Sequence, residues 1–355
     1  MHQKLDSIDY TETQFDMNKV LRIIEKSAVR PAMRALLHNK SYCAILCLHR
    51  VANLDQRRLL PNDHLKISAG FLERLIQSFK SEGYSFISMD EVCDNIKRKR
   101  RFNKNIALTF DDGYANVFTN GYPVLKSENV PATVYIATGL SSGDGILWWD
   151  VIEDALLENS KISLPDGRLV DISTKEAKTR LFMELRDWVF SLPVGEIKSK
   201  VAKLCGFCEE RILSYRNQMA SDDTLRSFAS DRLLSLGCHT HRHIPCGLLS
   251  DSEVCADISE SLRRLNLLGV RPLHFAFPYG LDEKNPKRFS QFFMDVGFSS
   301  CVTTCSNVVT SSSDPYFLPR VTVKEYGGFT AENIFDVRYN AVKDRVAKYI
   351  KSRKT

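Results

Sequence analysis

Short apolar runs alternate with longer amphipathic stretches along most of the chain from about residue 42 onward. The apolar runs have the length of β-strands, and most of them are followed by apolar residues at helical spacing. This rhythm is typical of β/α units, whose strands form a mainly parallel sheet. The strands are expected at 43–48, 84–88, 106–110, 132–138, 233–238, 273–277, 298–303 and 318–323.

Helices are expected in the intervals between most of these strands, at 71–81, 114–127, 251–268 and 286–296. The third is the best marked, because Ser250 and Glu253 form a capping-box pattern at its start and Gly269 follows its end. Seven or eight strand–helix units over this length favour a closed barrel over an open sheet. The predicted fold is therefore α/β, an irregular (β/α) barrel of seven or eight strands.

Three segments depart from this rhythm. Residues 1–40 are charged and helical in pattern, which predicts an N-terminal helical arm. Residues 147–230 are rich in Leu, Lys, Glu and Arg at helical spacing, which predicts a helical insertion. This insertion would interrupt a barrel that spans 41–325. Residues 326–355 are expected to form a C-terminal helical tail.

The composition of the chain limits the classes of protein to which it can belong. The chain has 355 residues, of which 43% are hydrophobic and 26% charged, as in ordinary globular domains. Its net charge of +6 is modest, and much of it could come from the basic run 97–101, which argues against a dedicated nucleic-acid binder. That run is interpreted as a solvated helix end, or else as a functional site that faces the phosphate of a nucleotide- or lipid-linked sugar or an anionic membrane surface.

The sequence also bears on location. Its start has no basic region followed by an apolar stretch of signal-peptide length, and no apolar run approaches the roughly 18 residues of a membrane helix. The ten cysteines are then interpreted as reduced thiols rather than as a disulfide framework. These features predict a cytoplasmic protein without an integral membrane span.

Candidate chemistry lies at the ends of two expected strands. Asp111 and Asp112 directly follow the strand 106–110, and three histidines lie within 239–243, after another strand. Functional groups of α/β proteins gather at the carboxyl ends of strands. The two clusters together predict a metal site of one carboxylate and two imidazoles, with a second carboxylate beside it. A helix-capping turn remains the alternative for the aspartate pair.

The chain resembles the NodB-like polysaccharide deacetylases of carbohydrate esterase family 4. The resemblance rests on Thr109-Phe-Asp-Asp-Gly113, His239-Thr-His-Arg-His243 and Phe275-Ala-Phe-Pro-Tyr-Gly280, in this order, and covers roughly 40–325 in pattern. The family implies an irregular (β/α) barrel. It also implies metal-dependent removal of an acetyl group from an N- or O-acetylated sugar.

The resemblance assigns roles to individual residues. Asp112, His239 and His243 match the ligands of a divalent metal ion, with zinc the expected ion, and Asp111 matches the general base. A bound metal acidifies water and polarises a carbonyl, so a neighbouring carboxylate that accepts a proton is chemically consistent with hydrolysis.

Further residues match the substrate side of the family site. Thr240, Pro278 and Tyr279 are expected to contact substrate, and the backbone N–H of Tyr279 would help to hold the oxyanion. Trp148 and Trp149 open the insertion, and their indoles could stack on a sugar ring. Core packing of the insertion against the barrel explains the two indoles equally well.

The chain departs from the family pattern at two points. Ala276 stands where many members carry an arginine that orients the base, and Arg320 is the candidate substitute, with a structural salt bridge as the alternative. Many members also carry a late catalytic-acid histidine, whereas no histidine follows His274 here. His49 is the candidate proton donor, because it resembles the donor of relatives whose motif order is permuted; a strand-end histidine without catalytic role is the alternative.

The predicted function is metal-dependent hydrolytic deacetylation of an N-acetylated sugar, a surface-polysaccharide or glycan precursor that could be nucleotide- or lipid-linked. Two alternatives stay open. One is hydrolysis of a non-sugar amide at the same metal centre, since a fold does not fix its substrate. The other is a catalytically silent barrel that binds a glycan or a protein partner.

Overall fold

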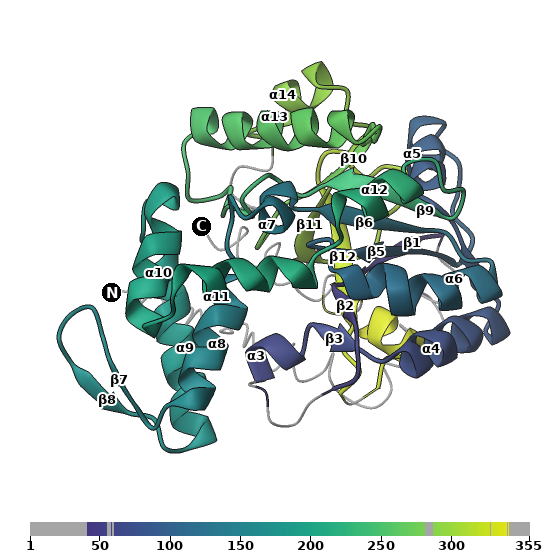
Figure 1. The fold of residues 1–355 in the computed structure, drawn as a ribbon. Helices are drawn as coiled ribbons and strands as arrows, with labels where there is room; N and C mark the ends of the chain where they lie inside the picture. Colours follow the sequence, from purple (N-terminus) through teal and green to yellow (C-terminus); the bar gives the residue numbers. More distant parts are fainter. Residues whose placement is uncertain are drawn as a thin grey trace, which may run out of the picture. The chain divides into compact units, whose positions relative to one another are not determined.

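Seven parallel strands close into a barrel in the computed structural model, which describes residues 41–54, 58, 60–280, 287–326, 328–338 and 340 (Figure 1). Each strand pairs with the next around the ring, and the last, β5, pairs back to β1. The order is β1 (Cys43–Leu48), β12 (Leu318–Thr322), β11 (Ser300–Ser306), β10 (His274–Ala276), β9 (Leu234–Cys238), β6 (Ala132–Ile136) and β5 (Asn105–Phe110).

An eighth strand, β4 (Ser85–Phe86), pairs only with the first two residues of β5. The predicted irregular (β/α) barrel of seven or eight strands is therefore confirmed, and all eight expected strands are present with slightly different bounds. They could be predicted because a barrel strand is covered on both faces and reads as a continuous apolar run. All six residues of β1 and all five of β6 are buried.

Helices cover the outside of the barrel, as expected. They include α4 (Ala69–Ser81), α13 (Asp251–Leu267) and α14 (Ser290–Asp295). The capping box of Ser250 and Glu253 is formed at the start of α13. The helix expected at 114–127 is instead a π-helical turn, Val117–Gly121, followed by α6 (Tyr122–Glu128).

The longest helix outside the insertion that the sequence did not predict precedes β5. It is α5 (Met89–Lys97), whose nine residues are too few for a clear apolar period, although Ser88 and Glu91 form a capping box at its start. The basic run 97–101 begins at the end of α5, where Arg98 and Arg100 both bind Asp94 on the surface. This is the solvated helix end that was one of its two interpretations.

The insertion lies between β6 and β9 and is mainly helical. Its longer helices α8 (Trp148–Glu158), α9 (Lys175–Phe190) and α10 (Ile197–Cys205) pack together beside the barrel (Figure 1). Shorter elements complete it: α7 (Thr138–Ser142), 3-10 turns at Val194–Glu196 and Tyr215–Gln218, α11 (Glu209–Ser214) and α12 (Asp222–Phe228).

The insertion also contains two strands that the sequence did not predict. Antiparallel strands β7 (Lys161–Ser163) and β8 (Leu169–Asp171) form a hairpin between α8 and α9. Strands of three residues are too short to show alternation, so only the turn residues Asp166 and Gly167 signalled them. Near β1, a second small pair joins β2 (Arg50–Val51) and β3 (Lys66–Ile67), with α3 (Leu60–Asp63) between them.

The expected arm at 1–40 lies outside the described residues, as does most of the expected tail, of which 331–338 are helical. Residues Ser41–Ile334 form one compact unit that includes the insertion. The exact division into arm, barrel and tail stays a prediction. No helix in the described part of the chain is long and apolar enough to span a membrane.

Candidate metal centre

The predicted site residues meet at one end of the barrel, where the parallel strands end. This follows from topology, because the carboxyl ends of parallel strands lie at the same edge. Asp111 and Asp112 follow β5, His49 follows β1, His239 follows β9, Tyr279 lies beyond β10, and Arg320 is within β12.

The backbone of this end is unusually constrained. Seven non-glycine residues in the described ranges have positive φ, and four of them are site residues: Asp112, Thr240, His243 and Tyr279. Non-glycine residues in this region are strained, and such strain persists where the surrounding structure imposes it, as it does at functional sites. Each side chain is thereby placed by a turn rather than by a regular element.

Gly237 allows strand β9 to place His239 at the mouth of the barrel. A Cβ on Gly237 would lie 2.5 Å from the ring of Tyr135 and 2.9 Å from the carbonyl oxygen of His274. Any larger residue would therefore push β9 away from its neighbours β6 and β10. Since His239 follows two residues later, Gly237 sets the depth of His239 in the barrel mouth.

Three ligand atoms face a common point. Oδ1 of Asp112 lies 3.4 Å from Nε2 of His239 and 3.1 Å from Nε2 of His243. Two ligand atoms about 2.0–2.1 Å from a tetrahedral zinc ion lie about 3.3 Å apart, so these separations suit a shared ion. The same Oδ1 is buried and has no hydrogen-bond partner among the described residues. Burying a carboxylate oxygen without a hydrogen-bond partner costs free energy unless a cation binds to it, so the residues fit a metal ion.

The far nitrogens of both histidines are also engaged. Nδ1 of His239 lies 2.8 Å from the carbonyl oxygen of Ala276, and Nδ1 of His243 lies 2.9 Å from the hydroxyl of Tyr279. A carbonyl only accepts, so His239 carries its proton on Nδ1 and leaves Nε2 free to bind a metal.

The electrostatics favour the charge states that a ligand set needs. Burial by itself raises the pKa of the Asp112 carboxyl, but the adjacent histidines outweigh burial and hold this pKa well below its usual range. Burial lowers the pKa of His243, against the opposing effect of Asp112. An anionic Asp112 and a neutral His243 are the forms that bind a divalent ion.

Asp111 has a different environment from its neighbour. Arg320 donates to it twice, from Nη1 to Oδ1 and from Nη2 to Oδ2, each over 2.6 Å. Burial raises the pKa of Asp111, but Arg320 outweighs it, with a smaller contribution from His239, and the pKa is lowered to about 2. Asp111 is thus held as a carboxylate beside the presumptive ligands.

His49 is brought to the same place. One of its ring nitrogens, the thiol of Cys47 and a carboxylate oxygen of Asp111 lie within 4.8 Å of one another. This trio is a poor second metal site, because both Asp111 oxygens already accept from Arg320. His49 is half-buried, whereas Cys47 is buried, so His49 is the member that can meet a ligand.

Thr240 and Pro278 are both buried. The Thr240 hydroxyl accepts a hydrogen bond from the backbone N–H of Ile244 over 3.3 Å, which ties the histidine loop together. Beyond Pro278, Gly280 N–H donates to the carbonyl of Phe277 over 3.1 Å and closes the turn that carries Tyr279. Direct contact of Thr240, Pro278 or Tyr279 with substrate stays a prediction.

Trp148 and Trp149 are each 6% exposed. The Trp148 ring stacks on Phe182 of α9, and its Nε1–H donates to the Tyr279 hydroxyl over 3.0 Å. The Trp149 Nε1–H donates to the Tyr114 hydroxyl over 2.9 Å. These contacts match the packing interpretation, and stacking on a sugar stays a prediction.

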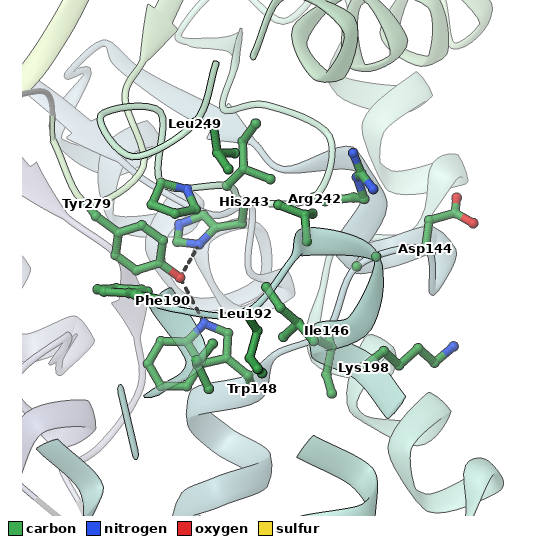
Figure 2. Close-up of a pocket in the computed structure, with 17 residues that line it drawn as sticks. Asp144, Ile146, Trp148, Phe190, Leu192, Lys198, Arg242, His243, Leu249 and Tyr279 are labelled. Carbon is green, nitrogen blue, oxygen red and sulfur yellow. Dashed lines mark hydrogen bonds between the residues drawn. The ribbon is translucent and has the colours of Figure 1, made fainter. Parts of the chain in front are cut away.

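A pocket of about 140 Å³ lies between the insertion and the histidine loop. Figure 2 shows Tyr279, Trp148 and His243 on one side of it and Asp144, Lys198 and Arg242 on the other. Most of the remaining lining is apolar: Ile146, Val189, Phe190, Leu192, Val194, Ile197, Ile244, Pro245 and Leu249.

Sequence reasoning missed two contacts of the ligands. The Ala276 carbonyl cannot be identified from a side-chain pattern. The Tyr279 hydroxyl was missed because the family resemblance directs Tyr279 at substrate and oxyanion, and no local pattern links Tyr279 to a histidine 36 residues away.

Known proteins resemble this chain in sequence over a limited stretch. The model of the polysaccharide deacetylase family matches residues 98–162, which contain both aspartates. A poly-beta-1,6-N-acetyl-D-glucosamine N-deacetylase of Staphylococcus aureus (strain MSSA476) is 34% identical over 74 residues, which are 21% of this chain and 25% of that protein. The match thus spans about a quarter of the length of the curated relatives.

Solved structures resemble it over a longer range. The Streptococcus pyogenes deacetylase PplD in complex with acetate aligns with a TM-score of 0.55 and 15% identity, over 84% of this chain and 99% of PplD. IcaB from Ammonifex degensii aligns with a TM-score of 0.52 and 18% identity, over 81% of this chain and 94% of IcaB. At such identities the likeness concerns the fold, and it agrees with the barrel described above.

Proposed function

We propose that this chain, which belongs to the NodB-like polysaccharide deacetylase family, hydrolyses the acetamide of an N-acetylated sugar at a divalent metal ion. The observation that carries the proposal is the arrangement of Asp112, His239 and His243. The Nε2 atoms of His243 and His239 lie 3.1 and 3.4 Å from the buried Oδ1 of Asp112, next to an ionised Asp111.

Asp112, His239 and His243 would hold the ion, and two imidazoles with one carboxylate suit zinc or another divalent transition ion. When bound, such an ion supplies a Lewis acid that polarises the acyl carbonyl and acidifies water. Three protein ligands leave room for water and substrate.

Asp111 would accept the proton of the attacking water. Arg320 keeps Asp111 ionised and fixes its plane through both oxygens. The Cys47 thiol also donates to Oδ2 over 3.6 Å, so Oδ1 is the oxygen better placed to accept a proton. Tyr279 would donate its backbone N–H to the developing oxyanion, since its turn carries the amide to the mouth of the barrel.

His49 would give a proton to the departing nitrogen. The new bond joins the water oxygen to the acyl carbon, the carbon–nitrogen bond breaks, and the products are acetate and a free amine. An amine leaves readily only when protonated, and the other candidate donors near Asp111 are less suited, because burial raises the pKa of the Cys47 thiol far above its usual range.

The substrate is proposed to be a glycan precursor rather than a finished polymer, nucleotide- or lipid-linked, in the cytoplasm. The relative's name concerns poly-beta-1,6-N-acetyl-D-glucosamine, which supports N-acetylglucosamine as the sugar to test first. The sugar, its linkage and the location of the reaction are all part of the proposal.

The test measures acetate and free amine released from N-acetylglucosamine and its β-1,6 oligomers by protein loaded with zinc, cobalt or nickel. We expect equal amounts of both products, and at least 100-fold less of each from Asp111→Asn at the same metal content. Acetate released from O-acetylated glucosamine, with none from these N-acetylated sugars, would indicate an O-acetyl substrate. Amide hydrolysis restricted to non-sugar amides, or glycan binding without any release, would replace the proposal with one of its alternatives.

A further inference from the structure

Trp148 and Tyr279 lie in a chain of hydrogen bonds that ends at a presumptive metal ligand. Trp148 Nε1 lies 3.0 Å from the Tyr279 hydroxyl oxygen, which lies 2.9 Å from Nδ1 of His243. Figure 2 shows the two bonds meeting at that oxygen. Trp148 is the first residue of α8, so the contact links the insertion to the barrel's histidine loop.

We propose that Trp148 and Tyr279 are positioning residues for the metal centre, which hold His243 with Nε2 unprotonated and directed at the ion. The inference rests on the proposed metal site and adds that the insertion helps to build it. It concerns the Tyr279 side chain, whereas the proposed catalytic role of Tyr279 uses only its backbone.

Only one direction of the chain is compatible with metal binding at Nε2 of His243. An indole N–H only donates, so Trp148 occupies one lone pair of the Tyr279 oxygen. The other lone pair can accept from Nδ1–H of His243, which leaves Nε2 bare toward Asp112. The opposite direction, with Tyr279 donating to Nδ1, would place the proton of a neutral His243 on Nε2 and block metal binding.

His243 depends on this support more than His239 does. The backbone carbonyl of Ala276, in strand β10, holds the His239 ring. His243 lies in a loop with φ +54, and side chains hold its ring. Its ring neighbours are Tyr279 at 4.6 Å, His239 at 4.9 Å and Trp149 at 5.0 Å between centroids. Partners of this kind typically change metal affinity by 10–100-fold when removed.

The Tyr279 hydroxyl in turn depends on Trp148. The Tyr279 residue is 38% exposed, and its ring packs against Phe190 and His243. The Trp148 ring is fixed by its stack on Phe182. Trp148 therefore acts on His243 through Tyr279, and the effects of removing the two groups should not add.

The experiment measures the zinc dissociation constant of the full chain by competition with a chromophoric chelator. The variants are Tyr279→Phe, Trp148→Phe and their double mutant. Tyr84→Phe is the control, since it also removes a hydrogen bond of a tyrosine hydroxyl, to Tyr42, but at the amino ends of the strands. Thermal unfolding of the metal-free proteins checks that each variant folds.

We expect Tyr279→Phe to weaken zinc binding 10–100-fold, Trp148→Phe to weaken it several-fold, and the double mutant to bind as Tyr279→Phe does. Tyr84→Phe should bind like the parent. Unchanged affinity in Tyr279→Phe, or additive effects in the double mutant, would overturn the inference while the proposed function stands. A parent that takes up no zinc, cobalt or nickel would overturn the proposed function itself.

Discussion

Arg320 and Asp111 face each other through two parallel hydrogen bonds of 2.6 Å at the centre of the barrel mouth. They come from β12 and from the end of β5, the two strands that flank β1. The Arg320 Nε also donates to the Thr303 carbonyl over 2.9 Å, and the residue is 1% exposed. A guanidinium with this many hydrogen bonds can keep a buried carboxylate ionised, because these bonds offset much of the free energy needed to remove both ions from water.

Removal of the guanidinium should be strongly destabilising. Arg320→Met leaves the Asp111 carboxylate buried without its partner, and we expect the free energy of unfolding to fall by about 3–5 kcal/mol. Arg320→Lys keeps a positive charge but cannot form the two parallel hydrogen bonds, so its free energy of unfolding should fall less than that of Arg320→Met. Urea denaturation of the metal-free proteins measures both. Equal stability of parent and Arg320→Met would contradict the pairing.

His49→Ala should separate catalysis from metal binding. We expect turnover to fall by about 10²–10⁴-fold, the usual contribution of a general acid, with the metal content unchanged. His64→Ala is the control, because His64 is also half-buried but packs edge-on against Tyr326. If His49→Ala turns over like the parent, the leaving amine is protonated by another group.

His274 predicts a pH dependence of stability away from the site. Burial lowers its pKa, but hydrogen bonds to Asp90 and Cys93 outweigh burial and raise it to about 9, against 6.5 for an ordinary histidine. A raised folded pKa stabilises the protein below about pH 6.5, and that stabilisation is lost as the pH rises through about 9. Since the Asp90 side chain is 63% exposed, solvent screening limits the loss to about 1–2 kcal/mol.

The measurement is the free energy of unfolding by urea from pH 6 to 9.5 in parent, Asp90→Asn and Asp94→Asn. In Asp90→Asn, the free energy of unfolding should decline less as the pH rises from 6 to 9.5. Asp94→Asn, on the same helix but paired with Arg98, which does not titrate in this range, should keep the decline of the parent. A parent whose stability is constant across the range would show that His274 is not charged in the folded protein.

The strands and the two main clusters of the site could be predicted from sequence for the same reason. Buried barrel strands read as apolar runs, and polar residues that directly follow them must lie at one edge. Arg320 could be proposed as a partner of Asp111 because adjacent carboxylates need a nearby positive charge.

Contacts set by turns and by long-range packing were not predictable. The bond between Trp148 and Tyr279 joins residues 131 positions apart and depends on how the insertion folds back. Tyr279 and His243 have positive φ, which directs their side chains in ways that neither strand nor helix periodicity describes. The hairpin of β7 and β8 was missed because strands of three residues carry almost no period.

The most direct test is the metal content per chain of protein purified without chelator, for the parent, Asp112→Ala, His239→Ala and the control His64→Ala. The account predicts about one zinc-like ion in the parent and in His64→Ala, and its loss from both ligand variants while their fold survives. A parent that holds no metal, and takes up none when zinc, cobalt or nickel is added, would contradict it.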